Sequence, residues 1–326
     1  MINTLRDSPV FICGHPGAGT NLLRAMLESC PAVIVYPEET NFFRMYLPNA
    51  SGKSLEKKLE LADRYLIQIF QWNRRNAPEH QAGFLDRDYS GIAFAEVQRT
   101  LRELVSQQFR HDGDMLSAAM LAFASVTGQL SPASRYWLEE TPFNEWFARQ
   151  IFELWPRAKC IHVVRDPRDN YVTYRQKHPE WTARFFAATW ERSTRLGLAS
   201  ADKYGPERYW LVSYEQFATR PEETWRSLCQ YLGIADDAAR QNLTWKSNPL
   251  APEHSSSIRP VPIGRWKEEL SPAQVAAIEG VARTGMRAMG YNQSVIDWKN
   301  IPGSTRMQLN AQILLSNLKE KLKWLK

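Results

Sequence analysis

The chain has 326 residues, of which 44% are hydrophobic, with 12 Trp and 12 Tyr, which is enough for one large globular domain or two smaller ones. No apolar run approaches the roughly 20 residues of a membrane span, and the segment before Pro9 has no signal-peptide core. Residues 304–326 carry five basic residues and one acidic residue out of a net charge of +6, so the remaining charge is too small to indicate nucleic-acid binding.

The four cysteines lie far apart and show neither zinc-ligand spacing nor a CxxC pair. We therefore expect reduced thiols, no bound metal and a cytoplasmic location.

The first predicted elements are a buried strand over Val10–Cys13, a glycine-rich loop and a helix over residues 21–28. Glycines let backbone N–H groups converge on one point, and the helix start adds about half a positive charge, which suits a phosphate or sulfate. The spacing from Gly14 to Gly19 matches a Walker loop, but Thr20-Asn21 replaces the lysine and hydroxyl of that loop. A P-loop kinase is therefore disfavoured. A βα turn without a ligand is the alternative for the loop alone.

Residues 31–43 then predict a second strand that ends in the acidic turn Glu38-Glu39-Thr40. From about residue 53 to 127, apolar residues recur at helical spacing, which predicts an insertion of two to four helices.

Strands and helices alternate again after the insertion. We expect strands over residues 136–138, 159–164 and 208–213, and helices over 143–154, from 165 through 174, 221–232 and 272–289. Prolines and serines indicate a long loop over residues 248–264. The pattern predicts an α/β fold, a P-loop-type doubly wound parallel sheet flanked by helices, with its ligands at the carboxyl ends of the strands.

Three further motifs follow strands or loops. Arg165-Asp-Pro-Arg ends a strand and has Thr173 eight residues later, a pairing suited to an anion, although a helix-capping ion pair would give the same pattern. Tyr214 follows the next strand directly. Ser257 and Gly264-Arg265-Trp266 stand in the long loop, where an Arg–Trp pair suits a base and a phosphate.

Taken together and in this order, the motifs resemble those of sulfotransferases that use 3′-phosphoadenosine-5′-phosphosulfate (PAPS), most closely the bacterial enzymes and the protein-tyrosine sulfotransferases. The resemblance covers nearly everything outside the insertion and the basic tail. It implies one α/β domain over residues 1–303, PAPS as donor and 3′-phosphoadenosine-5′-phosphate (PAP) as product. The implied reaction is transfer of a sulfuryl group to a hydroxyl or amine of a sugar, peptide or other small-molecule acceptor. The implied donor-binding residues are His15, Gly17, Ala18, Gly19, Thr20, Asn21, Arg165, Thr173, Tyr214, Ser257, Gly264, Arg265 and Trp266.

The resemblance places the catalytic base at Glu39 or at Glu38, and the match to Glu-Thr followed by aromatic residues favours Glu39 over an acidic strand cap. His15 is a secondary candidate that we expect to position other groups. Two departures concern charge, because this family usually has Arg or Lys at position 17 and often Lys at position 140. Arg24, Arg44, Arg265 and Lys267 are candidate replacements. Glu140 would instead pair with an acceptor amine or a neighbouring arginine.

The missing cations also support a second hypothesis. In it, the chain is a catalytically weakened relative of these enzymes that binds PAPS or PAP and serves as a binding or regulatory protein. Residues 304–326 predict a basic amphipathic helix. We expect its apolar face to pack on the body or on a second subunit. The alternative is contact with an anionic membrane, which would make the protein membrane-peripheral.

Overall fold

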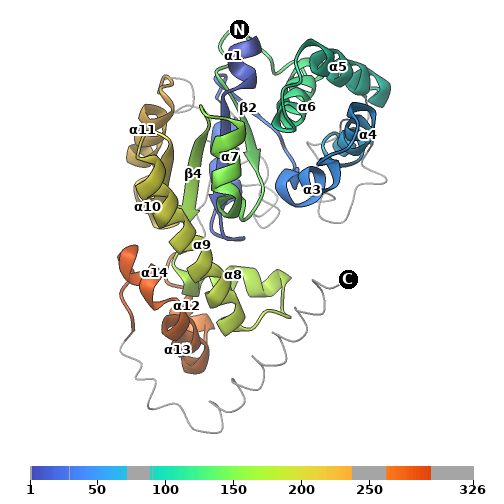
Figure 1. Cartoon of the computed structure of the whole chain (residues 1–326). Helices are drawn as coiled ribbons and strands as arrows, with labels where there is room; N and C mark the ends of the chain where they lie inside the picture. Colours follow the sequence, from blue (N-terminus) through green and yellow to red (C-terminus); the bar gives the residue numbers. More distant parts are fainter. Residues whose placement is uncertain (1, 29, 72–88, 90, 237–261, 295–326) are drawn as a thin grey trace.

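The structure is a computed structural model that describes residues 2–28, 30–71, 89, 91–236 and 262–294 (Figure 1). The predicted tail helix (residues 304–326), Ser257 and most of the predicted long loop lie outside these residues. No helix in the described part of the chain is long and apolar enough to cross a membrane. The four cysteines, all in the described part of the chain, are buried and form no disulfide bonds.

Five parallel strands form one sheet in the order β2-β3-β1-β4-β5. Their bounds are β1 (Pro9–Gly14), β2 (Val33–Val35), β3 (Tyr136–Glu140), β4 (Lys159–Val164) and β5 (Tyr209–Ser213). The central strand β1 is a continuous apolar run that is fully buried, as expected of a parallel strand covered on both faces. The predicted fold class is confirmed.

Helices cover both faces of the sheet and also form two side groups (Figure 1). Their bounds are α1 (Ile2–Arg6), α2 (Thr20–Glu28), α3 (Leu47–Ala50), α4 (Leu55–Tyr65), α5 (Phe94–Gln107), α6 (Gly113–Val126), α7 (Ala148–Leu154), α8 (Pro167–Lys177), α9 (Ala183–Tyr204), α10 (Tyr214–Thr219), α11 (Pro221–Leu232), α12 (Trp266–Glu269), α13 (Pro272–Val281) and α14 (Arg283–Ala288). A π-helix, η1 (Phe42–Tyr46), and two 3₁₀ turns, η2 (Gln68–Gln71) and η3 (Asn144–Phe147), complete the described elements.

Successive residues of β1 point into different cores. Phe11 and Cys13 pack into a core with α7 and the helices of the insertion, such as α6. Val10 and Ile12 pack into a core with α2 and α11. A third core lies among α8, α9, α13 and α14. In Figure 1, α3 to α6 gather beside the β2 edge of the sheet, whereas α12 and α13 contact α8, and α13 and α14 contact α9.

Several predicted elements differ in detail from the structure. The predicted strand over residues 31–43 is short, because Asn41 adopts a left-handed conformation (φ 49°) and Phe42 and Phe43 enter the π-helix. The predicted helix over 272–289 is two helices that meet at Ala282. The 22-residue helix α9 was not predicted.

Candidate active site

The loop between β1 and α2 is built around glycines with positive φ. Gly14, Gly17 and Gly19 have φ values of 145°, 79° and 103°, a range that side-chain-bearing residues rarely adopt. The N–H of Ala18 donates to the His15 carbonyl oxygen (3.0 Å), which closes the loop. Thr20 begins α2, so the expected donor-binding residues lie at the start of a nine-residue helix, with Gly17 and Asn21 exposed.

Two residues on other elements hold this loop in place. The amide of Asn170 on α8, with its nitrogen facing the loop, donates to the carbonyl oxygens of Pro16 and Gly17 (3.0 and 3.1 Å). Glu145 on η3 accepts the Gly14 N–H (2.9 Å) and the Ser193 hydroxyl proton (2.6 Å). Glu145 belongs to no motif, whereas Asn170 lies between Arg165 and Thr173 of the strand-end motif but was not predicted to support the loop.

His15 is buried beneath the loop. Its Nδ1 lies 3.1 Å from the Pro16 carbonyl oxygen and its Nε2 lies 2.9 Å from the Thr189 hydroxyl. Burial among aromatic rings lowers the pKa of His15 to about 3, so the imidazole is neutral at pH 7. We assign the proton to Nδ1, which leaves Nε2 as an acceptor for Thr189. With both ring nitrogens engaged, His15 has the environment of a positioning residue.

Arg165 presents a buried charge that the described residues leave largely unsatisfied. It is 2% exposed, and its Nη1 donates to Thr173 Oγ1 (3.2 Å) and to the Gly17 carbonyl oxygen (3.4 Å). Its guanidinium lies over the Tyr214 ring (4.3 Å). The Nε and Nη2 atoms have no hydrogen-bond partner among the residues described. A buried guanidinium with two free donors fits an anion such as a phosphate.

Tyr214 also packs against the loop, because a Cβ atom built on Gly19 would lie 2.5 Å from its ring. Arg165, Thr173 and Tyr214 therefore meet the glycine loop at one point, as the sequence predicted from strand ends. The residues around this point fit the anionic donor that the resemblance implies.

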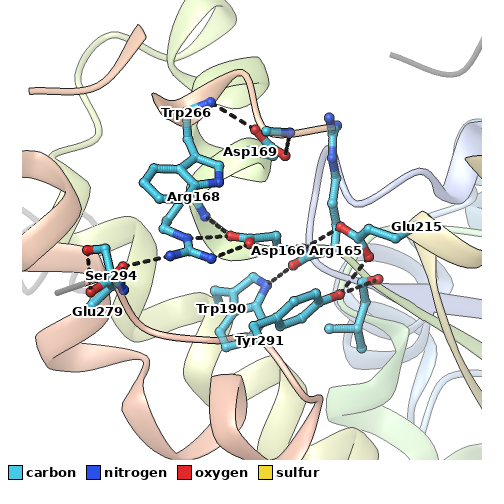
Figure 2. Close-up of polar contacts among 12 residues, drawn as sticks. Arg165, Asp166, Arg168, Asp169, Trp190, Glu215, Trp266, Glu279, Tyr291 and Ser294 are labelled. Atoms are coloured by element: carbon cyan, nitrogen blue, oxygen red, sulfur yellow. Dashed lines mark hydrogen bonds and ion pairs between the residues drawn. The ribbon is translucent and has the colours of Figure 1, made fainter. Parts of the chain in front are cut away.

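Ion pairs and hydrogen bonds connect the Arg165 motif to the turn at residues 264–266 (Figure 2). Asp166 caps α8 and pairs with the guanidinium of Arg168 (2.6 Å), which also reaches Glu279 on α13 (2.7 Å). Asp169 accepts the backbone N–H groups of Gly264 (2.6 Å) and Trp266 (3.0 Å). The predicted Gly264-Arg265-Trp266 turn is therefore fixed to the first turn of α8.

The side chains of this turn have protein partners. The Arg168 guanidinium lies over the Trp266 ring (3.9 Å), and Arg265 pairs with Glu269 (2.8 Å). Lys267 is exposed and lies 5.9 Å from the Trp266 ring centroid. Trp266 thus has one ring face occupied by an arginine of the same motif, and Arg265 is engaged before any ligand binds.

Acidic residues gather where β2 and β3 end. Glu39 is half-buried, and burial together with the charges of Glu140, Glu38 and Glu139 raises its pKa to about 8, against a smaller opposing effect of Arg44. Glu39 also contributes, after burial and Glu180, to raising the pKa of Tyr174 to about 12. A carboxyl group that titrates near neutral pH is suited to general base catalysis.

Glu139 is the structural member of this acidic group. It is 1% exposed and accepts hydrogen bonds from the backbone and hydroxyl of Thr40 (3.3 and 2.8 Å), from Asn144 (2.7 Å) and from the Thr141 hydroxyl. It therefore joins the segment that carries Glu39 to the end of β3. Glu139 is not among the site residues predicted from the sequence.

Two of the four candidate cations lie near the acidic group. Arg24 on α2 is buried, donates to Glu28 (2.6 Å) and lies 3.9 Å from Glu140. Arg44 donates to the Pro142 carbonyl oxygen and stands over the Phe143 ring (5.3 Å), and Glu145 and Glu39 both act electrostatically on it.

A pocket of about 490 Å³ adjoins the acidic segment. It is lined by Thr40, Asn41, Met45, Arg64, Tyr65 and Gln68. Because Thr40 follows Glu39 directly, the pocket gives a second molecule a place beside the candidate base. The described residues contain no group of three or more His, Cys, Asp or Glu side chains arranged to hold a metal.

Comparisons with known proteins agree with these features. A family model described as "Sulfotransferase family" matches residues 9–238. Protein-tyrosine sulfotransferase A of Caenorhabditis elegans is 24% identical over 305 residues, which cover 88% of this chain and 68% of that protein. Protein-tyrosine sulfotransferase 2 of Gallus gallus is 24% identical over 235 residues, covering 69% of this chain and only 51% of that protein. Among solved structures, the sulfotransferase domain from the curacin biosynthetic pathway shares the fold, with a TM-score of 0.50 at 16% identity, covering 88% of this chain and 99% of that domain.

Proposed function

Because this chain belongs to the sulfotransferase family, we propose that it transfers a sulfuryl group from PAPS to a hydroxyl group of an acceptor molecule, with Glu39 as the general base. PAPS, when bound, supplies the sulfuryl group, and PAP is the leaving group. The new bond joins the acceptor oxygen to sulfur, the bond between sulfur and the phosphate oxygen of PAP breaks, and Glu39 takes the hydroxyl proton.

The observation that carries this proposal is the unsatisfied guanidinium of Arg165. Its Nε and Nη2 lack partners among the described residues, and Thr173 lies beside its Nη1. Such a group favours a dianionic phosphate, and we assign it to the 3′-phosphate of the donor. Backbone N–H groups of the glycine loop and the start of α2 would hold the phosphosulfate.

The positions of Arg24 and Arg44 favour the proposal of an enzyme over the hypothesis of a binding protein. Position 17 has no side chain, and Gly17 could accept one only in a strained conformation, because its φ is 79° and a Cβ would lie 2.8 Å from the Asn170 side chain. A cation for the leaving oxygen must therefore come from another element. Arg24, one turn into α2, and Arg44, whose charge acts on Glu39, are the two that lie closest to the acidic group.

Equilibrium binding of PAP tests the donor site. Replacing Arg165 by Gln removes about 1.5–3 kcal/mol of charge-assisted hydrogen bonding, which should weaken PAP binding about 10- to 100-fold in calorimetry. Arg175→Gln, on the helix α8 that follows Arg165, is a control, because Arg175 pairs with Glu269 at 3.8 Å. Equal PAP affinity of the wild type and the Arg165→Gln variant would exclude the assignment.

Transfer of labelled sulfate from PAPS to a panel of acceptors tests the reaction. Glu39→Gln should lower kcat by about 10²- to 10⁴-fold and leave PAP affinity unchanged, because a general base acts only on the acceptor proton. Glu38→Gln, tested beside it, should cause the smaller loss. The reverse order would move the base to Glu38, and PAP binding without transfer to any acceptor would favour the binding-protein hypothesis.

A further inference from the structure

Glu140 is a buried carboxylate with little compensation. It is the last residue of β3 and is 3% exposed. No hydrogen-bond donor among the described residues reaches its Oε1 atom. The Oε2 atom lies 3.9 Å from Arg24 Nε, which is too far for a hydrogen bond, and Arg24 directs its shorter contact (2.6 Å) to Glu28. Burial of a carboxylate oxygen without a donor is costly, so this atom is suited to a ligand.

The surroundings of Glu140 favour a ligand that is a cationic donor. The negative charge of Glu140 is one of the causes that raise the pKa of Glu39 and of Glu139, so the acidic residues around it compensate none of that charge. Thr40, Thr141 and Asn144 direct their hydrogen bonds to Glu139 and so cannot satisfy Glu140 as well. PAPS is an anion and cannot fill the role. The group that complements Glu140 is therefore a positively charged donor on the acceptor.

An acceptor would approach Glu140 from the adjoining pocket. Among neighbouring charges, that of Glu140 raises the pKa of Glu39 the most, so the two side chains interact electrostatically. Thr40, next to Glu39, lines the pocket. The cation on the pocket wall, Arg64, is exposed and lies over the Tyr65 ring (5.4 Å), so it would repel an ammonium group towards the acidic end.

We propose that Glu140 binds a protonated amino group of the acceptor, so that the preferred substrates are hydroxyl compounds that also carry a primary amine. This inference rests on the proposed function. The ammonium group stays protonated and serves recognition, while the hydroxyl group loses its proton to Glu39 and forms the new bond to sulfur. Glu140 thereby determines specificity in the pocket, where the donor supplies only negative charge.

Matched pairs of acceptors test this inference. Tyramine and glucosamine, each beside its N-acetyl derivative, are offered to the full chain with labelled PAPS, and kcat/KM is measured for each. Acetylation removes the positive charge and keeps the hydroxyl groups. We expect the amine to be preferred by about 10- to 100-fold on at least one scaffold, the equivalent of one hydrogen bond to a charged group. Glu140→Gln should abolish that preference, and Glu140→Lys should reverse it.

A matched control separates Glu140 from its arginine. Glu28 is the other carboxylate that Arg24 contacts, and Glu28→Gln should leave the preference for the amine unchanged. PAP affinity of each variant reports whether it is folded with an intact donor site. If the wild type sulfates the amine and its N-acetyl derivative equally on both scaffolds, or if Glu140→Gln keeps the preference, the inference is wrong and the proposed function stands. If PAP binds but no acceptor is sulfated, the proposed function itself fails.

Discussion

The raised pKa of Glu39 predicts an unusual pH dependence. A base must be deprotonated to act, so with a pKa of about 8 only about a tenth of Glu39 is ionised at pH 7. We expect kcat/KM to rise about tenfold per pH unit below pH 8 and then level off, a change of about 100-fold between pH 6 and pH 9. The acceptor for this measurement should have no group that ionises in this range, so that the pH profile of kcat/KM reports only the ionisation of the enzyme.

The neighbours of Glu39 provide the internal test of this profile. Besides burial, the charges that raise its pKa are Glu140, Glu38 and Glu139, and Arg44 opposes them. Glu140→Gln should therefore lower the inflection by about one pH unit, and Arg44→Gln should raise it. His15 titrates near pH 3, so replacing it should not move the inflection. A profile that is flat between pH 6 and 9, or an inflection near 4.5, would refute the reasoning.

Stability gives an independent measure of the same shift. The pKa of Glu39 in the folded protein lies above its ordinary value of 4.5, so the folded protein binds more protons than the unfolded chain between pH 4.5 and 8. The contribution of Glu39 to stability is therefore present below pH 4.5 and is lost as the pH rises through 8. In urea denaturation, Glu39→Gln should be more stable than the wild type at pH 9, and this advantage should shrink at pH 5.

Two further changes test the architecture of the donor site. Asp169→Asn weakens the two backbone hydrogen bonds that hold the turn at residues 264–266 and should weaken PAP binding by about tenfold, measured by calorimetry, with little change in the melting temperature. Gly19→Ala places a Cβ 2.5 Å from the Tyr214 ring at a φ of 103°, so it should destabilise the fold by about 1–3 kcal/mol in urea denaturation and also weaken PAP binding. Unchanged affinity in either variant would contradict the site as described.

The sequence predicted the sheet because its strands are continuous apolar runs. The pattern failed at α9, which buries Ser193, Thr194, Gly197 and Ser200 on the face where a helical pattern needs large apolar residues. These small residues allow close packing, and a Cβ on Gly197 would lie 2.3 Å from the His162 ring. The buried residues of α9 do recur at helical spacing, but several of them are small or polar, so a pattern of hydrophobic residues does not reveal the helix.

The candidate donor site was predictable because the carboxyl ends of parallel strands share one edge. That rule brings the loop after β1, Arg165 after β4 and Tyr214 after β5 together from sequence alone. The supporting residues were not predictable. Glu139, Glu145 and Asn170 act through backbone groups and hydroxyls of distant segments, and their partners are fixed only by the fold.

The charge of the proposed transfer site depends on Glu140, whose departure from the family pattern is visible in the sequence but whose partner is not. From the sequence, Glu140 allowed two partners, an arginine or an acceptor amine. The structure supplies the arginine, yet at 3.9 Å and with its shorter bond made to Glu28, so Arg24 satisfies only part of the carboxylate. The raised pKa of Glu39 comes first from burial and then from the charges of Glu140, Glu38 and Glu139, and the Oε1 atom of Glu140 has no donor among the described residues. A cationic acceptor would correct both at once, since its ammonium group would satisfy Glu140 and lower the pKa of Glu39 towards the range in which it is ionised at pH 7. The base would then be most active when the right substrate is bound.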